Sequence, residues 1–561
     1  MKRLVLSAVC FLVTTAGSFA ANTEFYTQSG GNNLNAGSTT NNTAAYTSAG
    51  GNWANATRTF TPTDGSNPSA SVSVGDFCSV YVTAGATVAG YLARATTVTN
   101  ATNGTIIFSS TSTAGSNPSN GTGTMTCKCG GAWKGPNAAT LFPIGVTSLG
   151  ALTNTNGDWV RVNLKNDASY SLTSNIVTGS ISNYTVQGYS STVGDGGKAL
   201  ITINTTGSLG IQIVLSGGPM SFLDIIWENT GASLTNTLMS SANAGAVFIR
   251  NVWRGARSSG ISVTGTPTTF YECEWYDDNK ANGSGQAALL ISSGLAVCVN
   301  GYSHDHTSGT NADAYRVSAG SLYLFNSIAD TAAGNGVTLK TTSTGGVLQV
   351  FNSNFYNNTG DAINIANTAA QGFDLFVNNN FTKNSGKAIN NTTGATAGSS
   401  GVQAGIIYNN GRGSGTEANG GSDVLGSIVN TGTDVTYASN VEPYTAPTTG
   451  NFSTNLAAAE GTARGHFEQN DGTNTGTVGF PDIGAAQANI GCPYPTPTYT
   501  PTSTPTPTAT ATATFTPCAP TPTATSTFTP TATPTATSTA TATSTPTPSA
   551  TAPTYSLPSA R

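Results

Sequence analysis

The stretch Leu322-Tyr323-Leu324-Phe325-Asn326 returns 26 residues later in the same form, as Leu348-Gln349-Val350-Phe351-Asn352. The same step places Asn300 one period earlier and Asn378 one period later, each directly after a short apolar run. A fixed period of roughly 20–50 residues is typical of proteins built from stacked repeats. We therefore expect a series of coils, 26 residues each, that lie one above the other.

A second series keeps the same step and adds glycine and apolar residues to the pattern. Its members are Gly334, Gly360 and Gly386, followed by Val337, Ile363 and Ile389. The repeat contains β-type runs, Asn and Gly but no helical periodicity, which predicts a parallel β-helix. In such a stack one apolar side chain points inward at the same place in every coil. We expect each turn Asn to bond to the Asn above and below it.

The composition favours an all-β chain. Of 561 residues, 66 are glycine and only 8% are charged, against about 25% in ordinary globular proteins. Exposed helix faces usually carry charged residues, so their scarcity argues against many helices. β-Branched residues, with Gly and Asn in the turns, favour strands. The 37% of apolar residues is enough for a long, thin core.

Residues 1–20 have the pattern of a secretory signal peptide. Lys2-Arg3 is the basic start, an apolar stretch follows, and Ser18-Phe19-Ala20 is a small-residue cleavage site. The apolar stretch is too short to span a membrane, so we predict a secreted or cell-surface protein without membrane insertion. Removing two of the 20 basic residues leaves 18 against 25 acidic ones, a net charge of −7. That charge argues against nucleic acid and anionic membranes as partners.

Seven of the eight cysteines would remain after cleavage, because Cys10 lies in the signal. An odd number in an exported chain leaves at least one cysteine unpaired or paired between chains. Cys298 occupies the repeat position of Leu324, Val350 and Phe376, so we expect it to fill the core. The sequence assigns no disulfide pairing.

The composition divides the remaining chain into four segments. Residues 22–150 lack the 26-residue step and predict a β-rich N-terminal cap, and residues 151–436 carry the coils. Residues 437–490 would close the other end, since the ends of a stack expose unpaired strand edges. Residues 491–561 are mostly Thr, Pro, Ala and Ser, which cannot bury a core and predict a disordered, extended stalk.

The coil pattern resembles that of a known superfamily. The segment Val350-Phe351-Asn352-Ser353-Asn354-Phe355 is similar to the generic repeat of the right-handed parallel β-helix proteins, the pectate-lyase-like superfamily. Residues 25–38 resemble the opening of secreted members. Residues 442–452 and 481–485 resemble the closing segment of bacterial surface members. The resemblance implies a right-handed β-helix, but the superfamily holds lyases, hydrolases, epimerases, phage tailspikes and non-catalytic adhesins.

Three carboxylates are candidates for a metal site. Before Asn300, the same turn position is expected at Asp224, Asn251 and Cys273. Counted from Cys273, Asn300 and Asn326, the residues Asp278, Asp305 and Asp330 would form a column with one carboxylate in each coil. Stacked carboxylates repel one another unless a cation or protons neutralise them, and Ca²⁺ with its oxygen ligands is the natural partner. The alternative is that the three are ordinary turn residues that face water.

The same region holds candidate catalytic residues. Related lyases use Ca²⁺ to hold a uronate and an Arg or Lys as the base, and on that analogy Arg316 would remove the proton, with Arg254 and Arg257 as substitutes. His304 and His306 are alternative bases, because the ordinary pKa of histidine lies near neutrality.

Aromatic residues suggest a further contact with sugars. Trp253, Trp275 and Tyr302 would fall at one coil position and, if they face outward, would form a strip suited to stacking on sugar rings. The alternative places them in the core. Glu272 and Glu274 share a strand face and are the carboxylate pair that glycosidase chemistry would need.

These observations lead to one hypothesis and two alternatives. We expect an exported β-helix protein of the surface or extracellular matrix that binds a polysaccharide or cell-surface glycan in an adhesin-like, structural role. The first alternative is a Ca²⁺-dependent lyase or epimerase that acts on an acidic polysaccharide. The second is a fibre similar to a phage tailspike.

Overall fold

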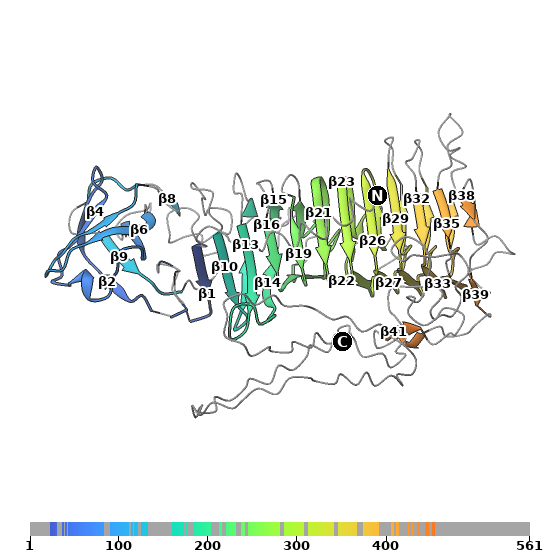
Figure 1. Ribbon diagram of the computed structural model, residues 1–561, viewed down its shortest axis with the longest axis horizontal. Coiled ribbons are helices and arrows are strands. Elements are labelled where there is room, and N and C mark those ends of the chain that lie inside the picture. Colours follow the sequence, from blue (N-terminus) through green and yellow to red (C-terminus); the bar gives the residue numbers. More distant parts are fainter. Residues whose placement is uncertain are drawn as a thin grey trace, which may run out of the picture.

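The computed structural model describes residues 23–132, 160–391 and short strands between 405 and 454, each range with gaps. These residues form an all-β rod with one short 3-10 helix, η1 (Pro68–Ala70). The rod is a right-handed parallel β-helix, which confirms the predicted fold (Figure 1). The predicted signal peptide (1–20) and stalk (491–561) lie outside the described residues. In the part of the chain that the structure describes, no helix has the length and apolar character needed to cross a membrane.

Each regular coil has three strands and two sharp bends. In one coil β26 (Ser321–Phe325) ends at a bend on Asn326, β27 (Ile328–Asp330) ends at a bend on Thr331, and β28 (Val337–Leu339) follows. Stacking the coils makes three sheet faces, which we number in that order: face 1 contains β26, face 2 β27 and face 3 β28.

Faces 1 and 3 merge into one 20-stranded sheet, because β21 and β23 run through both without a turn. Its strands are β1 (Thr23–Thr27), β10 (Val160–Lys165), β12 (Ile176–Val177), β13 (Tyr184–Tyr189), β15 (Ile213–Leu215), β16 (Met220–Leu223), β18 (Met239–Ser241), β19 (Val247–Ile249), β21 (Ile261–Tyr271), β23 (Ala287–Val299), β25 (Asp313–Val317), β26, β28, β29 (Val347–Phe351), β31 (Ile363–Ile365), β32 (Asp374–Val377), β34 (Ile389–Asn391), β35 (Gly405–Tyr408), β37 (Val424–Leu425) and β38 (Ile428–Asn430).

Face 2 is an 11-stranded parallel sheet with one strand from each coil. Its strands are β11 (Ser169–Leu172), β14 (Ala199–Ile203), β17 (Ile225–Asn229), β20 (Val252–Arg254), β22 (Glu274–Tyr276), β24 (Tyr302–His304), β27, β30 (Asn354–Tyr356), β33 (Asn380–Thr382), β36 (Gly411–Gly413) and β39 (Val435–Tyr437).

An antiparallel domain is inserted into the first coil and caps that end of the rod (Figure 1). β1, which lies within residues 22–150 of the predicted cap segment, pairs with β10 of the rod. The inserted strands are β2 (Tyr46–Ser48), β3 (Gly51–Ala54), β4 (Thr59–Pro62), β5 (Phe77–Val82), β6 (Gly90–Val98), β7 (Ile106–Phe108), β8 (Ala114–Gly115) and β9 (Met125–Cys129).

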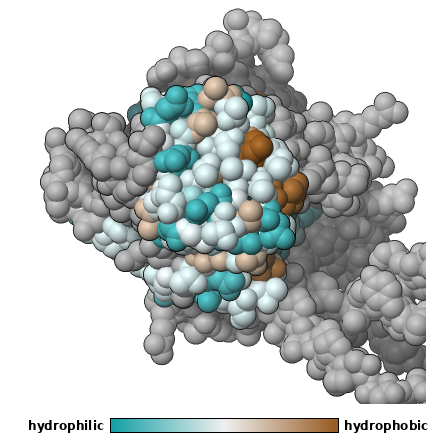
Figure 2. All heavy atoms as spheres, turned by 90° about the vertical axis from the view of Figure 1, so that its left-hand side faces the viewer, coloured by the Kyte–Doolittle hydropathy of each residue, from teal (hydrophilic) through white to brown (hydrophobic). Residues whose placement is uncertain are grey.

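The contact between cap and rod is apolar. Phe77, Tyr81 and Leu92 of the cap join the core of the rod, and the rings of Phe77 and Phe25 lie 5.3 Å apart. The capped end thereby loses the exposed apolar coil that an open stack would present to water. The outer end of the cap is mostly polar or neutral, with only a few hydrophobic residues among those coloured (Figure 2).

Cysteines are used in two ways. Cys78 and Cys129, on the neighbouring strands β5 and β9, form a disulfide inside the cap. A disulfide of this kind is typical of proteins that fold in an oxidising compartment. Cys127, Cys273 and Cys298 are buried thiols, and Cys298 fills the rod core as its repeat position predicts.

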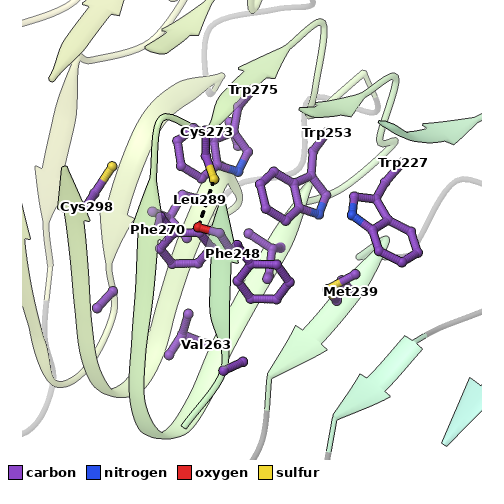
Figure 3. Packing of buried hydrophobic residues seen from close by; sticks show 14 of the residues in the cluster. Trp227, Met239, Phe248, Trp253, Val263, Phe270, Cys273, Trp275, Leu289 and Cys298 are labelled. Carbon is purple, nitrogen blue, oxygen red and sulfur yellow. Dashed lines mark hydrogen bonds between the residues drawn. The ribbon is translucent and has the colours of Figure 1, made fainter. Parts of the chain in front are cut away.

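Stacked aromatic rings fill the middle of the rod (Figure 3). The rings of Trp253 and Trp275 lie 5.3 Å apart and nearly parallel, and those of Phe248 and Phe270 lie 5.2 Å apart. Both tryptophans are fully buried. The hypothesis of an outward aromatic strip is therefore wrong for Trp253 and Trp275, and the core alternative holds.

The first bend of each coil uses a residue in the left-handed conformation. The four periodic asparagines have φ between 49° and 56°, a region that Asn occupies more readily than most residues. The bends before them fall on Asp224, Arg250 and Glu272. The sequence placed those three bends on Asp224, Asn251 and Cys273, so two of them were one residue late.

The residue after each bend points inward and ties the coils together. Ser327 Oγ accepts the N–H of Gly301, Ser353 Oγ accepts that of Ser327, and Asn379 Oδ1 accepts that of Ser353, at 2.9–3.2 Å. This series, which we call the first inner ladder, lies one position after the asparagines to which we had assigned the stacking. Its side chains satisfy backbone groups that would otherwise be buried without partners.

The second bend repeats the arrangement. Asp277, Asp305, Thr331, Asn357 and Lys383 are left-handed, with φ between 51° and 57°. The next residue again points inward: Asn358 Oδ1 accepts the N–H of Ala332, and Asn384 Oδ1 accepts that of Asn358, at 3.0 and 3.1 Å. We call this series the second inner ladder.

A C-terminal hairpin lies against the outside of the rod. β40 (Tyr444–Ala446) and β41 (Asn451–Thr454) pair with each other, and Figure 1 shows β41 beside face 2. Tyr444 is buried against Tyr302, Ile328 and Tyr356. Burying an aromatic side chain stabilises by about 1.5–3 kcal/mol, so Tyr444 contributes to the attachment of the hairpin.

We expect Asn358→Ala to lower the free energy of unfolding by about 2–3 kcal/mol, because it leaves the Ala332 N–H and the Ala329 carbonyl without partners. Its neighbour Asn357 is exposed and left-handed, so Asn357→Gly should change stability by less than about 0.5 kcal/mol. Guanidinium denaturation followed by circular dichroism measures both variants. Equal losses would contradict the inner ladder.

Candidate functional site

The outer surface of face 2 carries a polar series at one position. The strands there have three residues, of which the middle one points into the core and the outer two point away from it. The third residues are aligned from coil to coil; they are Glu228, Arg254, Tyr276, His304, Asp330, Tyr356 and Thr382. Histidine, carboxylate and tyrosine side chains therefore meet on neighbouring strands.

His304 is held between two carboxylates. Its Nε2 lies 3.0 Å from Oε1 of Glu274, and its Nδ1 lies 2.9 Å from Oδ2 of Asp305. The ring also stacks on Tyr302 and Tyr276, with centroids 4.1 and 5.3 Å away. Only 3% of the side chain is exposed, so both ring nitrogens are fixed by the protein itself.

The surroundings of His304 keep its ring charged. Burial lowers its pKa, but the hydrogen bonds to Asp305 and Glu274 outweigh burial and raise the pKa to about 9. At neutral pH both ring nitrogens therefore carry protons and donate to the two carboxylates. A charged imidazolium has no lone pair to accept a proton, so His304 does not fit the predicted role of general base at neutral pH.

Asp330 lies beside His304 in the next coil. Burial raises its pKa to about 6, against the opposing effects of the Thr331 hydroxyl and the imidazolium of His304. Thr331 Oγ1 donates to Asp330 Oδ1 at 2.7 Å. Asp305, by contrast, is 54% exposed, and its hydrogen bond to His304 lowers its pKa.

The three predicted metal ligands do not form a column. Asp278 follows the second bend and belongs to the second inner ladder, Asp305 is itself a bend residue, and Asp330 is the last residue of β27. Asp278 is displaced because the preceding bend lies on Glu272 rather than on Cys273, and Asp330 because it lies four residues after Asn326, whereas Asp305 lies five after Asn300. Among the described residues, no group of three or more His, Cys, Asp or Glu is placed to hold a metal ion. Calcium at these residues stays a prediction.

Asp278 and His306 are interior residues. Asp278 Oδ1 accepts the N–H of Ala256 at 2.8 Å, and His306 Nδ1 accepts the N–H of Asp278 at 3.2 Å. Burial raises the pKa of Asp278 well above its usual value and is the main cause of the fall in the pKa of His306 to about 3. Burial thus favours the neutral form of both side chains, which lie away from solvent.

The Ser303–His306 contact resembles a catalytic pair only in its distance, 2.8 Å from Oγ to Nε2. Because Nδ1 of His306 accepts a backbone N–H, the proton of the neutral ring is on Nε2 and is donated to Ser303. This tautomer cannot take the proton of the serine hydroxyl. Both side chains are also fully buried, so the pair is structural.

Arg316 lies on face 3, on the outer side of β25, away from His304 on face 2. Its Nη1 donates to Asp313 Oδ2 at 3.0 Å. Strand register continues the same outward position through Thr338, Asn364 and Asn390. We call these four residues the Arg316 row.

The Arg316 row contains polar atoms without partners. Nε of Arg316, Oδ1 of Asn364 and Oδ1 of Asn390 are buried and make no hydrogen bond. Leaving a buried polar atom unpaired costs about 1–3 kcal/mol. Three such atoms, one donor and two acceptors, belong to partly exposed side chains that follow one another along face 3.

The structure thus brings together His304, Asp305, Asp330 and Tyr302 of the predicted residues. It separates Arg316 from them and places Trp253, Trp275, Asp278 and His306 inside the rod. Sequence reasoning missed Tyr276, Tyr356 and the role of Glu274 as a partner of His304. Moving two bends by one residue, to Arg250 and Glu272, would have aligned Tyr276 with His304.

The known proteins to which the chain is similar are distant. No family model and no curated protein matches the chain. Among solved structures it is similar to the pectate lyase Pel9A, with 14% identity and a TM-score of 0.41, over 62% of this chain and 92% of that one. It is also similar to the Gp54 tailspike of Acinetobacter baumannii bacteriophage AP22, solved with a capsular saccharide, with 10% identity, a TM-score of 0.18 and 76% of each chain covered. The fold makes the chain a right-handed parallel β-helix protein, and likenesses this distant transfer no activity.

We expect His304 to titrate near pH 9, against about 6.5 for an unperturbed histidine. The stability that its charge contributes is complete below about pH 6.5 and is lost as the pH rises through about 9. NMR of ¹³C-labelled histidine can follow this ring, since the chain has three histidines. Glu274→Gln should lower the midpoint, because it removes one of the two anions. A wild-type midpoint near 6.5 would show that the two carboxylates do not hold the proton.

Proposed function

We propose that the protein is an exported, non-catalytic β-helix protein that binds a polysaccharide or cell-surface glycan along the Arg316 row. The observation that carries the proposal is the series of partly exposed polar side chains, Arg316, Asn364 and Asn390, at one outward position of face 3. Export is supported by the signal-like residues 1–20 and by the disulfide Cys78–Cys129.

The geometry of the row suits a repeating polymer. Its residues stand one coil apart, and coils stack at the spacing of neighbouring strands, about 4.8 Å. Sugar hydroxyls both donate and accept hydrogen bonds, so they suit the exposed parts of the guanidinium of Arg316 and of the amide side chains of Asn364 and Asn390. A glycan that lies across the strands would meet the same type of contact at each coil.

The arrangement of charges favours binding over catalysis. The guanidinium of Arg316 is paired with Asp313, His304 is protonated between two carboxylates, and His306 is buried. Lyase chemistry on the predicted residues would need Arg316 near the three aspartates, whereas these lie on face 2 or in the interior. The predicted lyase residues therefore do not converge.

We expect the double variant Asn364→Ala/Asn390→Ala to weaken glycan binding by about tenfold or more, because two hydrogen bonds at about 0.5–1.5 kcal/mol each are lost. A glycan array with the full-length protein identifies the ligand, and calorimetric titration then gives the Kd. The matched control is Gln349→Ala, which removes a partly exposed amide from face 1 and should leave Kd unchanged.

Two results would contradict this function. Equal losses in the double variant and in Gln349→Ala would show that the row is not the binding surface. Release of unsaturated uronate from pectate, alginate or chondroitin with Ca²⁺, followed by absorbance and abolished in Asp305→Ala, would establish a lyase instead.

A further inference from the structure

We propose that Tyr444 occupies a second sugar-binding pocket, on the outer surface of face 2, and that this pocket takes a neutral pyranose ring when the C-terminal hairpin is displaced. The pocket is separate from the Arg316 row, and the inference does not depend on the function proposed for that row.

The pocket is built by three successive coils. Tyr302 from β24, Ile328 from β27 and Tyr356 from β30 form its walls, and together with Tyr444 they make an apolar cluster apart from the rod core. The rings of Tyr444 and Tyr356 meet edge to face, with centroids 5.4 Å apart. Tyr444 is 1% exposed, so its ring fills the space between these walls.

The two described strands of the hairpin are not paired with strands of the rod. Among the described strands β40 and β41 form a two-stranded sheet of their own, with Tyr444 opposite Thr454. The coils of the rod, by contrast, are joined by continuous parallel strand pairing. Displacing β40 and β41 therefore leaves the strand pairing of the rod intact.

A tyrosine ring and a pyranose ring can contact the same kind of pocket. Each presents an apolar face to aromatic walls and a hydroxyl group at its edge. The hydroxyl of Tyr444 lies 3.5 Å from Oγ1 of Thr382, at the limit of a hydrogen bond. A sugar hydroxyl at this place would find the same partner.

The charges near the pocket select among sugars. The carboxyl groups of Asp330, Asp305 and Glu274 lie around His304, whose ring stacks on Tyr302. Lys383 adds one cation, 5.7 Å from the Tyr356 ring. Acidic groups outnumber basic ones, which disfavours uronates and other anionic sugars and favours neutral ones.

The test is Tyr444→Ala in the full-length protein, which empties the pocket without touching the rod. We expect binding of neutral oligosaccharides of glucose, galactose or mannose to strengthen at least tenfold, and binding of oligogalacturonate to stay unchanged, by calorimetric titration. Adding Tyr356→Ala should abolish the gain, because it removes a wall of the pocket. Adding Tyr323→Ala, which removes a partly exposed tyrosine from face 1, should leave the gain in place.

Hydrogen exchange of β40 in the same variants shows whether the hairpin has been released. A released hairpin without gain for any neutral sugar would overturn the proposal, as would a gain that survives Tyr356→Ala. A hairpin that exchanges as slowly in Tyr444→Ala as in the parent would show that Tyr444 does not hold it, which also overturns the proposal. Binding to the Arg316 row is read separately in Asn364→Ala/Asn390→Ala.

Discussion

The structure depends on the two bends of each coil. A β-helix must bend its chain twice in a few residues while keeping every backbone group of the interior hydrogen-bonded. This chain does so with a pair of residues: the first takes the left-handed conformation, and the second sends a Ser or Asn side chain inward to accept an N–H from the coil below. The three sheet faces, the aromatic stack and the outward rows keep their register because these corners repeat.

The 26-residue period was enough to predict the fold and the inward position of Cys298. It also directed attention to the coil that contains His304 as a candidate site. It was not enough to predict which residues share a column, because the coils between Arg250 and Asn300 are 22 and 28 residues long. An error of one residue at Cys273 was sufficient to align Trp275 with Tyr302, although the structure pairs Trp275 with the inward Ser303. In strands with alternating sides, a shift of one residue exchanges the core for the surface.

The sequence could not predict the candidate sites, because their residues come from distant positions in the chain. The pairing of His304 with Glu274 links residues 30 positions apart across two coils, and Tyr444 reaches the rod from 62 residues beyond Thr382. The unpaired atoms of the Arg316 row become visible only when the partners of every polar atom are known. Composition and spacing carry none of this information, whereas hydrogen bonds and burial do.

The cap inserted between β1 and β10 has a consequence for folding order. The first rung of the rod joins segments 137 residues apart, so it cannot form until the whole insertion has been synthesised. Closing so long a loop is entropically costly while the insertion is unfolded, and less so once a compact domain brings its two ends together. The disulfide Cys78–Cys129 lies within that domain. A folded, disulfide-linked cap therefore lowers the entropic cost of closing the first coil of the rod.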